Sequence, residues 1–582
     1  MKSLLKLLPY FRRHRAKYIW GILLTTASSL ATVFLPRYVG HAINSLQSGT
    51  ATNASLIEDA LFIMGSSAIA GYLFYLVRQN IIVASREIEY DLRNDFLGHI
   101  MTLSMRYFQN TPQGEVMAYA TNDINAVRNF VGPAVMYTSD TITTFVFSLF
   151  FMLSISPQLT VICLAPLPLM SIAVYIIGKR VHPLFDDVQS HYADLTARAT
   201  ESISGMKVVK AYVRESYERE LFDKLSDDYY KKNMRLAKLQ ALMMPAIFGF
   251  VGFSIVLLLL FGSPAMISGG LKLGDLTQFI IYLGMLTWPF IGIGIVTNMV
   301  QRSAASMARL EKIFQMKAEI IDNEQTDNSI TEINGAIEFR NVSFKYGEAL
   351  PFVLDGVSLK IAQGKTLAII GKTGSGKSSM VQLIPRLFDT SGGDILIDGK
   401  NIKTIPLQVL RGGIGVVQQE SFLFSESIGA NITYGIDGED TAVIESAARS
   451  AEMLRDISEF PHQFDTIVGE RGITLSGGQK QRTALARAIA RNPKILILDD
   501  AMSAVDTSTE ERILANLREI MRGRTSIIIS HRISTVKDAD EIIVIDNGKI
   551  SERGNHTQLL NLRGAYHDLY RKQLLEEALE KV

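Results

Sequence analysis

Six stretches of the chain carry almost no charge and are long enough to cross a bilayer. The first, from Tyr18 to Pro36, would span about 28 Å as a helix rising 1.5 Å per residue. The uncharged stretch from Thr141 to Gly178 is too long for one crossing, and the proline-containing segment Ser154–Gln158 divides it into two. The pattern predicts spans at about residues 17–39, 58–84, 133–154, 157–179, 239–267 and 274–301.

The distribution of basic residues predicts the orientation of these spans. Lysine and arginine collect before the first span and between Lys179 and Lys238, whereas the loop from Gly40 to Asp59 contains neither. Because basic loops stay on the cytoplasmic side, we expect a multi-pass protein of the cytoplasmic membrane with both termini inside. Residues 1–16 favour an interfacial helix before a retained span. A cleaved signal peptide is the alternative, although about 19 uncharged residues exceed the usual apolar core of a signal.

Charge and periodicity divide the rest of the chain. The inner loops, from Arg78 to about Arg128 and from Lys179 to about Lys238, have helical patterning, so we expect the membrane helices to extend into the cytoplasm. The polar, aperiodic segment 317–335 predicts a linker. It separates a transmembrane domain (17–316) from a soluble α/β domain (336–572), and 573–582 form a tail. With 59 basic and 58 acidic residues, the chain has almost no net charge to attract nucleic acid, so we expect no nucleic-acid partner.

One segment of the soluble domain fits the phosphate-binding pattern G-x-x-x-x-G-K-[ST] at every position, and the apolar run before it predicts a buried strand. The segment comprises Gly371, Lys372, Thr373, Gly374, Ser375, Gly376, Lys377 and Ser378, followed by Ser379. Glycines let backbone N–H groups turn inward around a phosphate, Lys377 reaches the β and γ oxygens, and Ser378 offers a hydroxyl to Mg²⁺. The chain is therefore predicted to bind ATP with Mg²⁺.

Two further motifs of this domain suit phosphate chemistry. Ile495–Asp499 predicts a buried strand whose terminal carboxylate, Asp499, is suited to the Mg²⁺ shell. Leu475 precedes a helix N-terminus that forms a second anion site. That site comprises Ser476, Gly477, Gly478 and Gln479. One chain thus carries two phosphate-binding surfaces.

Together these motifs resemble an ATP-binding-cassette (ABC) exporter half-transporter of the multidrug-resistance type, and the resemblance covers nearly the whole chain. It implies an all-α six-helix transmembrane domain followed by an α/β P-loop NTPase domain. It also implies that two cassettes close head to tail, each ATP lying between one subunit's phosphate loop and the other's LSGGQ. Two inner-loop segments, Tyr107–Glu115 and Glu201–Gly205, resemble the coupling regions of that family.

The resemblance also implies roles for single residues. Tyr346 would stack on adenine, Gln419 would sense Mg²⁺, and His531 would contact the γ-phosphate. Asp506 would lie in the loop that crosses the dimer interface. For Tyr346 the alternative is an ordinary aromatic at a strand end, and for His531 it is a satisfied loop histidine.

The chain departs from the family at the catalytic carboxylate, since Asp500 stands where the family normally has glutamate. A general base must lie about 2.6–3.2 Å from its proton, so withdrawal by about 1.5 Å would forfeit much of a contribution of roughly 10²- to 10⁴-fold. The alternative is a backbone shift that lets Asp500 work. In the family that the chain resembles, this substitution is typical of heterodimers in which one of the two sites binds ATP but hydrolyses it slowly. We therefore expect a different half-transporter, bearing glutamate, as partner.

These features predict ATP-driven efflux of hydrophobic or amphipathic compounds, drug-like or lipid-like. Asp140 lies about 20 Å along a helix from the outer turn, so it is a candidate contact for a cationic cargo. Its alternative is an ordinary charge near cytoplasmic water. The rival functions are an ATP-binding regulatory or sensory membrane subunit without cargo, and a homodimeric lipid flippase. Transport into vesicles with and without the partner would separate an exporter from a regulator.

Overall fold

The computed structural model describes residues 2–438, 440–502 and 507–580. The chain divides into two compact units. The first comprises Met1–Ile100 and Gly114–Gln315, and the second comprises Met101–Gln113 and Met316–Val582. Every regular element of the first unit is helical in the described residues, whereas the second combines helices with two β-sheets.

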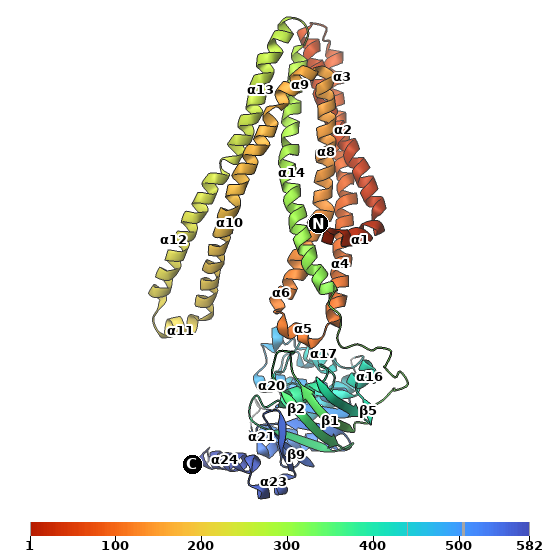
Figure 1. Cartoon of the computed structure of the whole chain (residues 1–582), viewed down its shortest axis with the longest axis vertical. Helices are drawn as coiled ribbons and strands as arrows, with labels where there is room; N and C mark the ends of the chain where they lie inside the picture. Colours follow the sequence, from red (N-terminus) through yellow and green to blue (C-terminus); the bar gives the residue numbers. More distant parts are fainter. Residues whose placement is uncertain (1, 439, 503–506, 581–582) are drawn as a thin grey trace. The chain divides into compact units, whose positions relative to one another are not determined.

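Six helical runs in the described part of the chain are long and apolar enough to cross a membrane. They are Arg15–Gln47, Asn53–Thr102, Gln113–Ile155, Pro157–Ser204, Glu215–Ile267 and Leu273–Phe314. Their α-helices are α2 (Arg15–Gln47), α3 (Asn53–Val77), α4 (Val83–Thr102), α6 (Gln113–Ala118), α7 (Ile124–Asn129), α8 (Val135–Ile155), α9 (Pro157–Leu164), α10 (Pro166–Ser204), α12 (Glu215–Gln240), α13 (Met243–Ile267) and α14 (Leu273–Phe314). The 3₁₀ turn η1 (Lys2–Leu7) and α1 (Leu8–Arg13) precede them, and α11 (Met206–Ala211) joins α10 to α12, which run side by side (Figure 1).

Capping residues and prolines explain one boundary between these helices and one of the π-helical turns within them. Between α8 and α9, Ser156 is extended and its hydroxyl accepts from the N–H of Leu159 at 3.4 Å, while Pro157 occupies the first position of α9. Three π-helical turns interrupt the runs, namely η2 (Arg78–Ile82), η3 (Tyr119–Asp123) and η4 (Phe130–Ala134). Pro133 lies inside η4, and because proline has no N–H the ordinary α-helical hydrogen bond is lost there.

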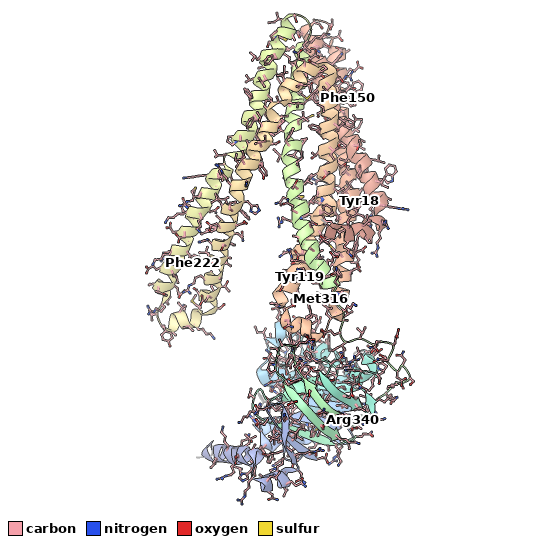
Figure 2. The ribbon with its side chains drawn as sticks, in the orientation of Figure 1. Tyr18, Tyr119, Phe150, Phe222, Met316 and Arg340 are labelled. Atoms are coloured by element: carbon pink, nitrogen blue, oxygen red, sulfur yellow. The ribbon has the colours of Figure 1, made fainter. Side chains whose placement is uncertain are left out.

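Apolar side chains occupy both the inside and the outside of this helical unit. In its core, Phe279 and Tyr282 of α14 are fully buried, and the Tyr282 hydroxyl donates to the carbonyl of Val33 at 3.0 Å. On the outside, large apolar residues such as Phe150 of α8 remain exposed (Figure 2). An apolar exterior over helices of this length suits a lipid environment.

The second unit is built on two sheets. An antiparallel sheet of order β2-β1-β4-β5 lies beside a mixed sheet of order β10-β9-β3-β8-β7-β6, in which β10 alone runs antiparallel to its neighbour. The strands are β1 (Ile337–Phe344), β2 (Leu354–Ile361), β3 (Thr366–Ile370), β4 (Gly392–Ile397), β5 (Lys400–Asn401), β6 (Ile414–Val417), β7 (Ile495–Asp499), β8 (Thr525–Ile529), β9 (Glu541–Asp546) and β10 (Lys549–Gly554). All residues of β7 and β8 are buried, as expected for parallel strands covered on both faces.

Short helices cover this sheet core. They are α15 (Lys377–Leu383), α16 (Leu407–Gly412), α17 (Ile428–Thr433), α18 (Thr441–Ser450), α19 (Leu454–Glu459), α20 (Gly477–Ala490), α21 (Thr507–Met521), α22 (Ile533–Val536), α23 (His556–Leu562) and α24 (Ala565–Glu580), with 3₁₀ turns η5 (Gln463–Asp465) and η6 (Glu470–Gly472). The tail expected from residue 573 onward is helical, because α24 continues through it to Glu580.

The segment between α14 and β1 has no helix or strand, yet it is fastened to the second unit. Ile330 and Ile333 are buried in the core around β1. The Asp398 carboxylate accepts from the backbone N–H groups of residues 334–336 at 2.5 to 3.3 Å. The predicted linker 317–335 is therefore held at its C-terminal end by apolar packing and by one carboxylate.

The segment Met101–Gln113, between the second and third helical runs, also belongs to the second unit. It carries α5 (Met105–Asn110), where the sequence places the first coupling region. Arg106 lies 3.6 Å from the Glu319 carboxylate, and the Ser104 hydroxyl donates to the same carboxylate at 3.2 Å. Polar contacts thus fasten α5 to the segment that leads into the cassette sheet.

Candidate functional site

The carboxyl ends of four parallel strands form one cavity of about 330 Å³. The phosphate loop follows β3, Gln419 follows β6, Asp499 ends β7, and His531 follows β8. Parallel strands end at one edge of a sheet, so residues far apart in the sequence meet there. The cavity is lined by Tyr346, Val353, Thr373, Gly374, Gly376, Lys377, Ser378, Ser379, Gln419, Asp499, Asp500, Ile529 and His531.

The phosphate loop depends on glycine at its start and its end. Gly371 has φ +152° and Gly376 has φ +103°, both in the region that side-chain-bearing residues avoid. A Cβ atom on Gly371 would lie 2.2 Å from the carbonyl oxygen of Ile545, and one on Gly376 would lie 2.7 Å from that of Val353. Gly371, Lys372 and Ser375 belong to the same loop but are not among the residues that line the cavity.

Lys377 and Asp499 are opposite charges in a largely buried place. The Lys377 ammonium donates to the carbonyls of Gly371 and Lys372, each at 2.9 Å. Burial lowers the pKa of Lys377, against the effect of the Asp499 and Asp500 carboxylates. Burial also raises the pKa of Asp499, against a hydrogen bond from the Ser378 hydroxyl. Because little water surrounds the Lys377 ammonium and the Asp499 carboxylate, each would interact strongly with a charged group of a bound ligand.

Tyr346 lies just beyond the end of β1, at the rim of the cavity. Its hydroxyl lies 2.9 Å from the Ser379 hydroxyl, and its ring contacts Phe344 and Phe388 edge-on, with centroids 4.9 and 5.3 Å away. Edge-on packing against two phenylalanines fixes the plane of the Tyr346 ring, and Tyr346 lines the cavity. An aromatic face held in this way can stack on a planar base.

Asp500 follows the metal-binding candidate Asp499 directly. It adopts φ +47°, which is uncommon for a residue with a side chain, and its N–H donates to the carbonyl of Ile529 at 2.9 Å. The bond ties Asp500 to the end of β8, one strand away, where Ser530 and His531 follow. The three residues predicted to act in catalysis, Gln419, Asp500 and His531, therefore line the same cavity.

The residues predicted for a second anion site lie at the start of α20. The Ser476 hydroxyl accepts from the N–H of Gln479 at 3.2 Å, and the Gln479 carboxamide accepts from the N–H of Ser476 at 3.0 Å, a capping box. The Gln479 side chain also donates to Asp456 at 2.9 Å. None of Ser476, Gly477, Gly478 and Gln479 is among the described residues that line the phosphate-loop cavity. Asp506, predicted for the dimer interface, lies outside the described residues.

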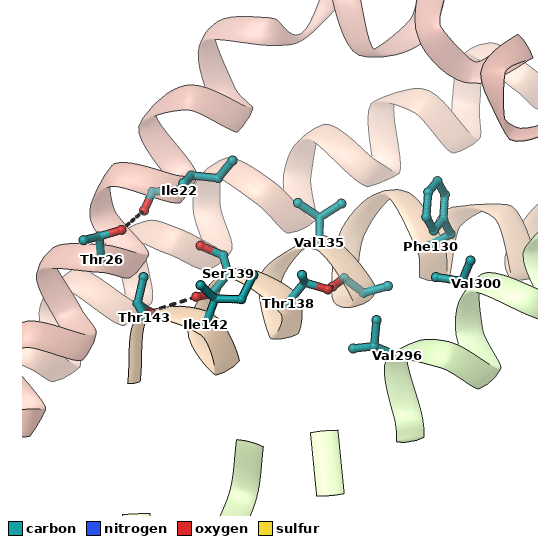
Figure 3. A pocket seen from close by; sticks show the side chains of 11 residues that line it. Ile22, Thr26, Phe130, Val135, Thr138, Ser139, Ile142, Thr143, Val296 and Val300 are labelled. Atoms are coloured by element: carbon teal, nitrogen blue, oxygen red, sulfur yellow. Dashed lines mark hydrogen bonds between the residues drawn. The ribbon is translucent and has the colours of Figure 1, made fainter. Parts of the chain in front are cut away.

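A second cavity, of about 480 Å³, lies in the membrane unit between α2, α8 and α14 (Figure 3). Its wall is mainly apolar, with hydroxyl groups from Thr26, Thr138, Ser139 and Thr143. Three of these hydroxyls donate to carbonyls one turn earlier in their own helix, at 2.7 to 3.0 Å. Their hydrogen-bonding capacity is thus partly used, and the cavity offers a weakly polar surface. Sequence reasoning had not singled out these residues, because hydroxyls are ordinary in membrane helices.

Asp140 is half-buried next to this cavity but is not among its lining residues. Its carboxylate accepts from the Ser29 hydroxyl of α2 at 3.0 Å, and the oxygen of the Thr143 hydroxyl lies 2.9 Å from that of Ser29. Thr143 lines the cavity, so a short chain of hydroxyls joins the carboxylate to the cavity wall. No lysine, arginine or histidine of the described residues forms an ion pair with Asp140 within 4.0 Å.

A six-span membrane unit joined to a P-loop cassette with an intact LSGGQ defines an ABC half-transporter. Residues 18–290 match the family described as ABC transporter transmembrane region, and residues 354–503 match the family described as ABC transporter. The chain belongs to the ABC transporters, and the predicted fold class and ATP-binding cassette are confirmed.

Similar proteins match along most or all of the chain. One is the probable multidrug resistance ABC transporter ATP-binding/permease protein YheI of Bacillus subtilis (strain 168), 35% identical over 100% of this chain and 99% of the relative. The ATP-dependent lipid A-core flippase of Pseudomonas syringae pv. tomato (strain ATCC BAA-871 / DC3000) is 36% identical over 84% of this chain and 81% of its own. A bacterial Atm1-family ABC exporter solved with ATP bound is 28% identical, with a TM-score of 0.77 covering 97% of this chain and 98% of that one. The predicted exporter class is thus confirmed.

Proposed function

We propose that this chain is one half of an exporter that couples ATP binding and hydrolysis to the outward movement of an amphipathic compound across the cytoplasmic membrane, with both termini in the cytoplasm. The observation that carries the proposal is the meeting of Lys377, Asp499 and His531 at the ends of neighbouring strands, in a chain with six membrane helices. The weakly polar cavity between α2, α8 and α14 supports an apolar or amphipathic cargo.

In this proposal each residue of the cassette cavity has a chemical task toward ATP. The loop from Gly371 to Ser379 surrounds the phosphates with backbone N–H groups, and Lys377 neutralises β and γ oxygens. The ring of Tyr346 stacks on the adenine. His531 contacts the γ-phosphate, and Asp500 positions the attacking water.

The donor set also fits Mg²⁺. This ion prefers oxygen ligands and is commonly held by one or two carboxylates together with phosphate oxygens. The Ser378 hydroxyl hydrogen-bonds to the Asp499 carboxylate, so two suitable oxygens lie together, with Gln419 on the same cavity. No group of three or more His, Cys, Asp or Glu that could hold a metal occurs in the described residues, which is consistent with a site completed by phosphate. The ion would neutralise charge on the transferred phosphoryl group.

We further propose that the site formed with this chain's Lys377 hydrolyses slowly and that the working partner is a different half-transporter bearing glutamate. The bond from the Asp500 N–H to Ile529 supports this, because it limits how far the backbone can advance to compensate for the shorter side chain. Ser476–Gln479 would complete the partner's site. Asp506 would lie at the interface between the two cassettes.

Two classes of cargo are supported by the relatives. The first is drug-like, as the name of the B. subtilis protein indicates for that protein, and the second is a lipid, as the name of the P. syringae flippase indicates for that one. Within the first class we favour amphipathic cations, because Asp140 is an intramembrane carboxylate connected to the cavity by hydroxyl groups.

Transport by the full chain, reconstituted into lipid vesicles with the co-purified partner, tests the proposal. We expect ATP-dependent accumulation of a fluorescent amphipathic cation, lost in Lys377→Ala and retained in the matched control Lys360→Ala, whose side chain is exposed on β2. ATP-dependent conformational change without flux of any drug-like or lipid probe would instead identify a regulatory subunit.

A further inference from the structure

The last helix of the chain is fastened to the cassette along one face. The Glu552 carboxylate of β10 accepts from the first N–H groups of α24, those of Ala565 at 2.5 Å and Tyr566 at 3.2 Å. Tyr566 is fully buried, and its hydroxyl lies 2.6 Å from Nδ1 of His556. Tyr570, one turn later, contacts the same histidine ring edge-on, with centroids 5.4 Å apart. The start of α24 is therefore fixed in position.

Gln573 continues this face, because positions i, i+4 and i+7 lie on one side of a helix. Its carboxamide makes two hydrogen bonds to the loop after β8. The oxygen accepts from the N–H of Ile533 at 2.8 Å, and the nitrogen donates to the carbonyl of His531 at 2.5 Å. One side chain thus holds the backbone on both sides of Arg532, immediately after the histidine that lines the nucleotide cavity.

The bond to Ile533 satisfies a group that would otherwise lack a partner within its own helix. Ile533 is the first residue of α22, and the first N–H groups of a helix have no intrahelical acceptor. The preceding residue, Arg532, does not cap α22 with its side chain. Gln573 supplies this cap from a helix about 40 residues later in the chain, so the start of α22 and the histidine loop depend on α24.

We propose that Gln573 is a positioning residue for the nucleotide site, which holds His531 at the γ-phosphate side of the cavity and makes ATP recognition depend on the docking of the C-terminal helix. The inference rests on the role proposed above for His531. Only the γ-phosphate distinguishes ATP from ADP, so a displaced His531 should weaken ATP binding and leave ADP binding unchanged.

The test measures the affinity of the purified full chain for Mg·ATP and for Mg·ADP in lipid nanodiscs. In Gln573→Leu, which keeps the volume and loses both hydrogen bonds, we expect the preference for ATP over ADP to fall roughly three- to tenfold. Gln573→Glu keeps an acceptor for Ile533 but loses the donor to His531, so a smaller fall is expected. The matched control is Leu575→Ala, an exposed residue of the same helix, which should keep the preference of the unmodified chain.

Hydrogen exchange of the segment 530–536 checks the contact itself. The amide of Ile533 should exchange roughly tenfold faster in Gln573→Leu than in Leu575→Ala, because its acceptor is gone. Unchanged exchange would overturn the inference even if nucleotide affinities moved. A thermal unfolding midpoint equal to that of the control separates loss of positioning from loss of folding.

A double-substitution cycle separates this inference from the proposed function. His531→Ala should lower the preference for ATP, and adding Gln573→Leu should lower it no further, since both changes act through one contact. If His531→Ala has no effect, the proposed role of His531 fails and the inference fails with it. If His531→Ala has an effect and Gln573→Leu has none, only the positioning role is overturned.

Discussion

At the scale of single residues, Asp500 is one methylene group shorter than the glutamate usual at this position, and this difference should decide how fast the site hydrolyses ATP. Its backbone is held with φ +47° and by the bond to Ile529, which limits how far the backbone can advance to compensate for the shorter side chain. Asp500→Glu should therefore extend the carboxylate by about 1.5 Å and raise ATP turnover at this site by at least roughly tenfold, out of a possible 10²- to 10⁴-fold. Steady-state hydrolysis by the full chain, with Asp500→Asn as the inactive reference, measures the effect. Equal turnover by the unmodified chain and the Asp500→Glu variant, at equal ATP affinity, would show that aspartate suffices.

Asp140 presents a similar question inside the membrane unit, where the same side chain can be a cargo contact or a structural hydrogen-bond acceptor. Asp140→Asn keeps the shape and can still accept from Ser29. If the carboxylate binds cationic cargo, transport of an amphipathic cation should fall about tenfold, while that of a neutral analogue stays within about twofold. The control is Ser154→Ala, an exposed position near the C-terminal end of the same helix. Equal losses for both cargoes would indicate a structural role.

At the scale of elements, α2 and α14 approach each other through glycine. A Cβ atom on Gly274 would lie 2.0 Å from the carbonyl oxygen of Gly40, and the Gly274 N–H donates to the Asn44 side chain at 2.7 Å. Backbone atoms cannot move aside as a flexible side chain can, so Gly274→Ala should separate the two helices and cost about 1–3 kcal/mol. The midpoint of thermal unfolding in detergent should fall by several degrees. Gly284→Ala on the same helix meets no atom within 4 Å and should leave the midpoint unchanged or slightly raised.

Sequence reasoning succeeded where the physical cause is local. Long uncharged runs predicted the membrane helices, and the spacing of Gly371, Gly376 and Lys377 predicted the phosphate loop, because bilayer thickness and phosphate geometry act on neighbouring residues. It could not find the hydroxyl chain from Asp140 to the cavity or the contact of Gln573 with the loop after His531. Each contact joins helices or loops that are far apart in the sequence. The hydrophobic periodicity of a segment does not indicate which distant side chains it will contact.

Across the whole molecule, the proposal gives one cassette two unlike halves of a nucleotide site. The cavity at the strand ends contains the phosphate loop, the metal-binding candidates and His531, whereas the capped start of α20 contributes no lining residue among those described. A helix N-terminus can bind an anion, and this one lies outside the described lining of the cassette's own nucleotide cavity, so any phosphate that it binds would be one held elsewhere. Pairing with a second cassette would supply it. If the partner bears glutamate, this chain contributes the weaker carboxylate to one shared site and an intact LSGGQ to the other.

This arrangement predicts unequal effects of substitutions within the same chain when it is assembled with its partner. Ser476→Ala should lower hydrolysis by the complex roughly tenfold or more, because Ser476 would serve the fast site, whereas Asp500→Asn should lower it less than about twofold. Ser476 also caps α20, so the matched control is Ser427→Ala, which removes the capping hydroxyl of α17 in the same cassette. Hydrolysis by the purified complex at saturating ATP is the measurement. Equal losses from Ser476→Ala and Asp500→Asn would mean that both sites turn over alike, as two identical copies of this chain would require.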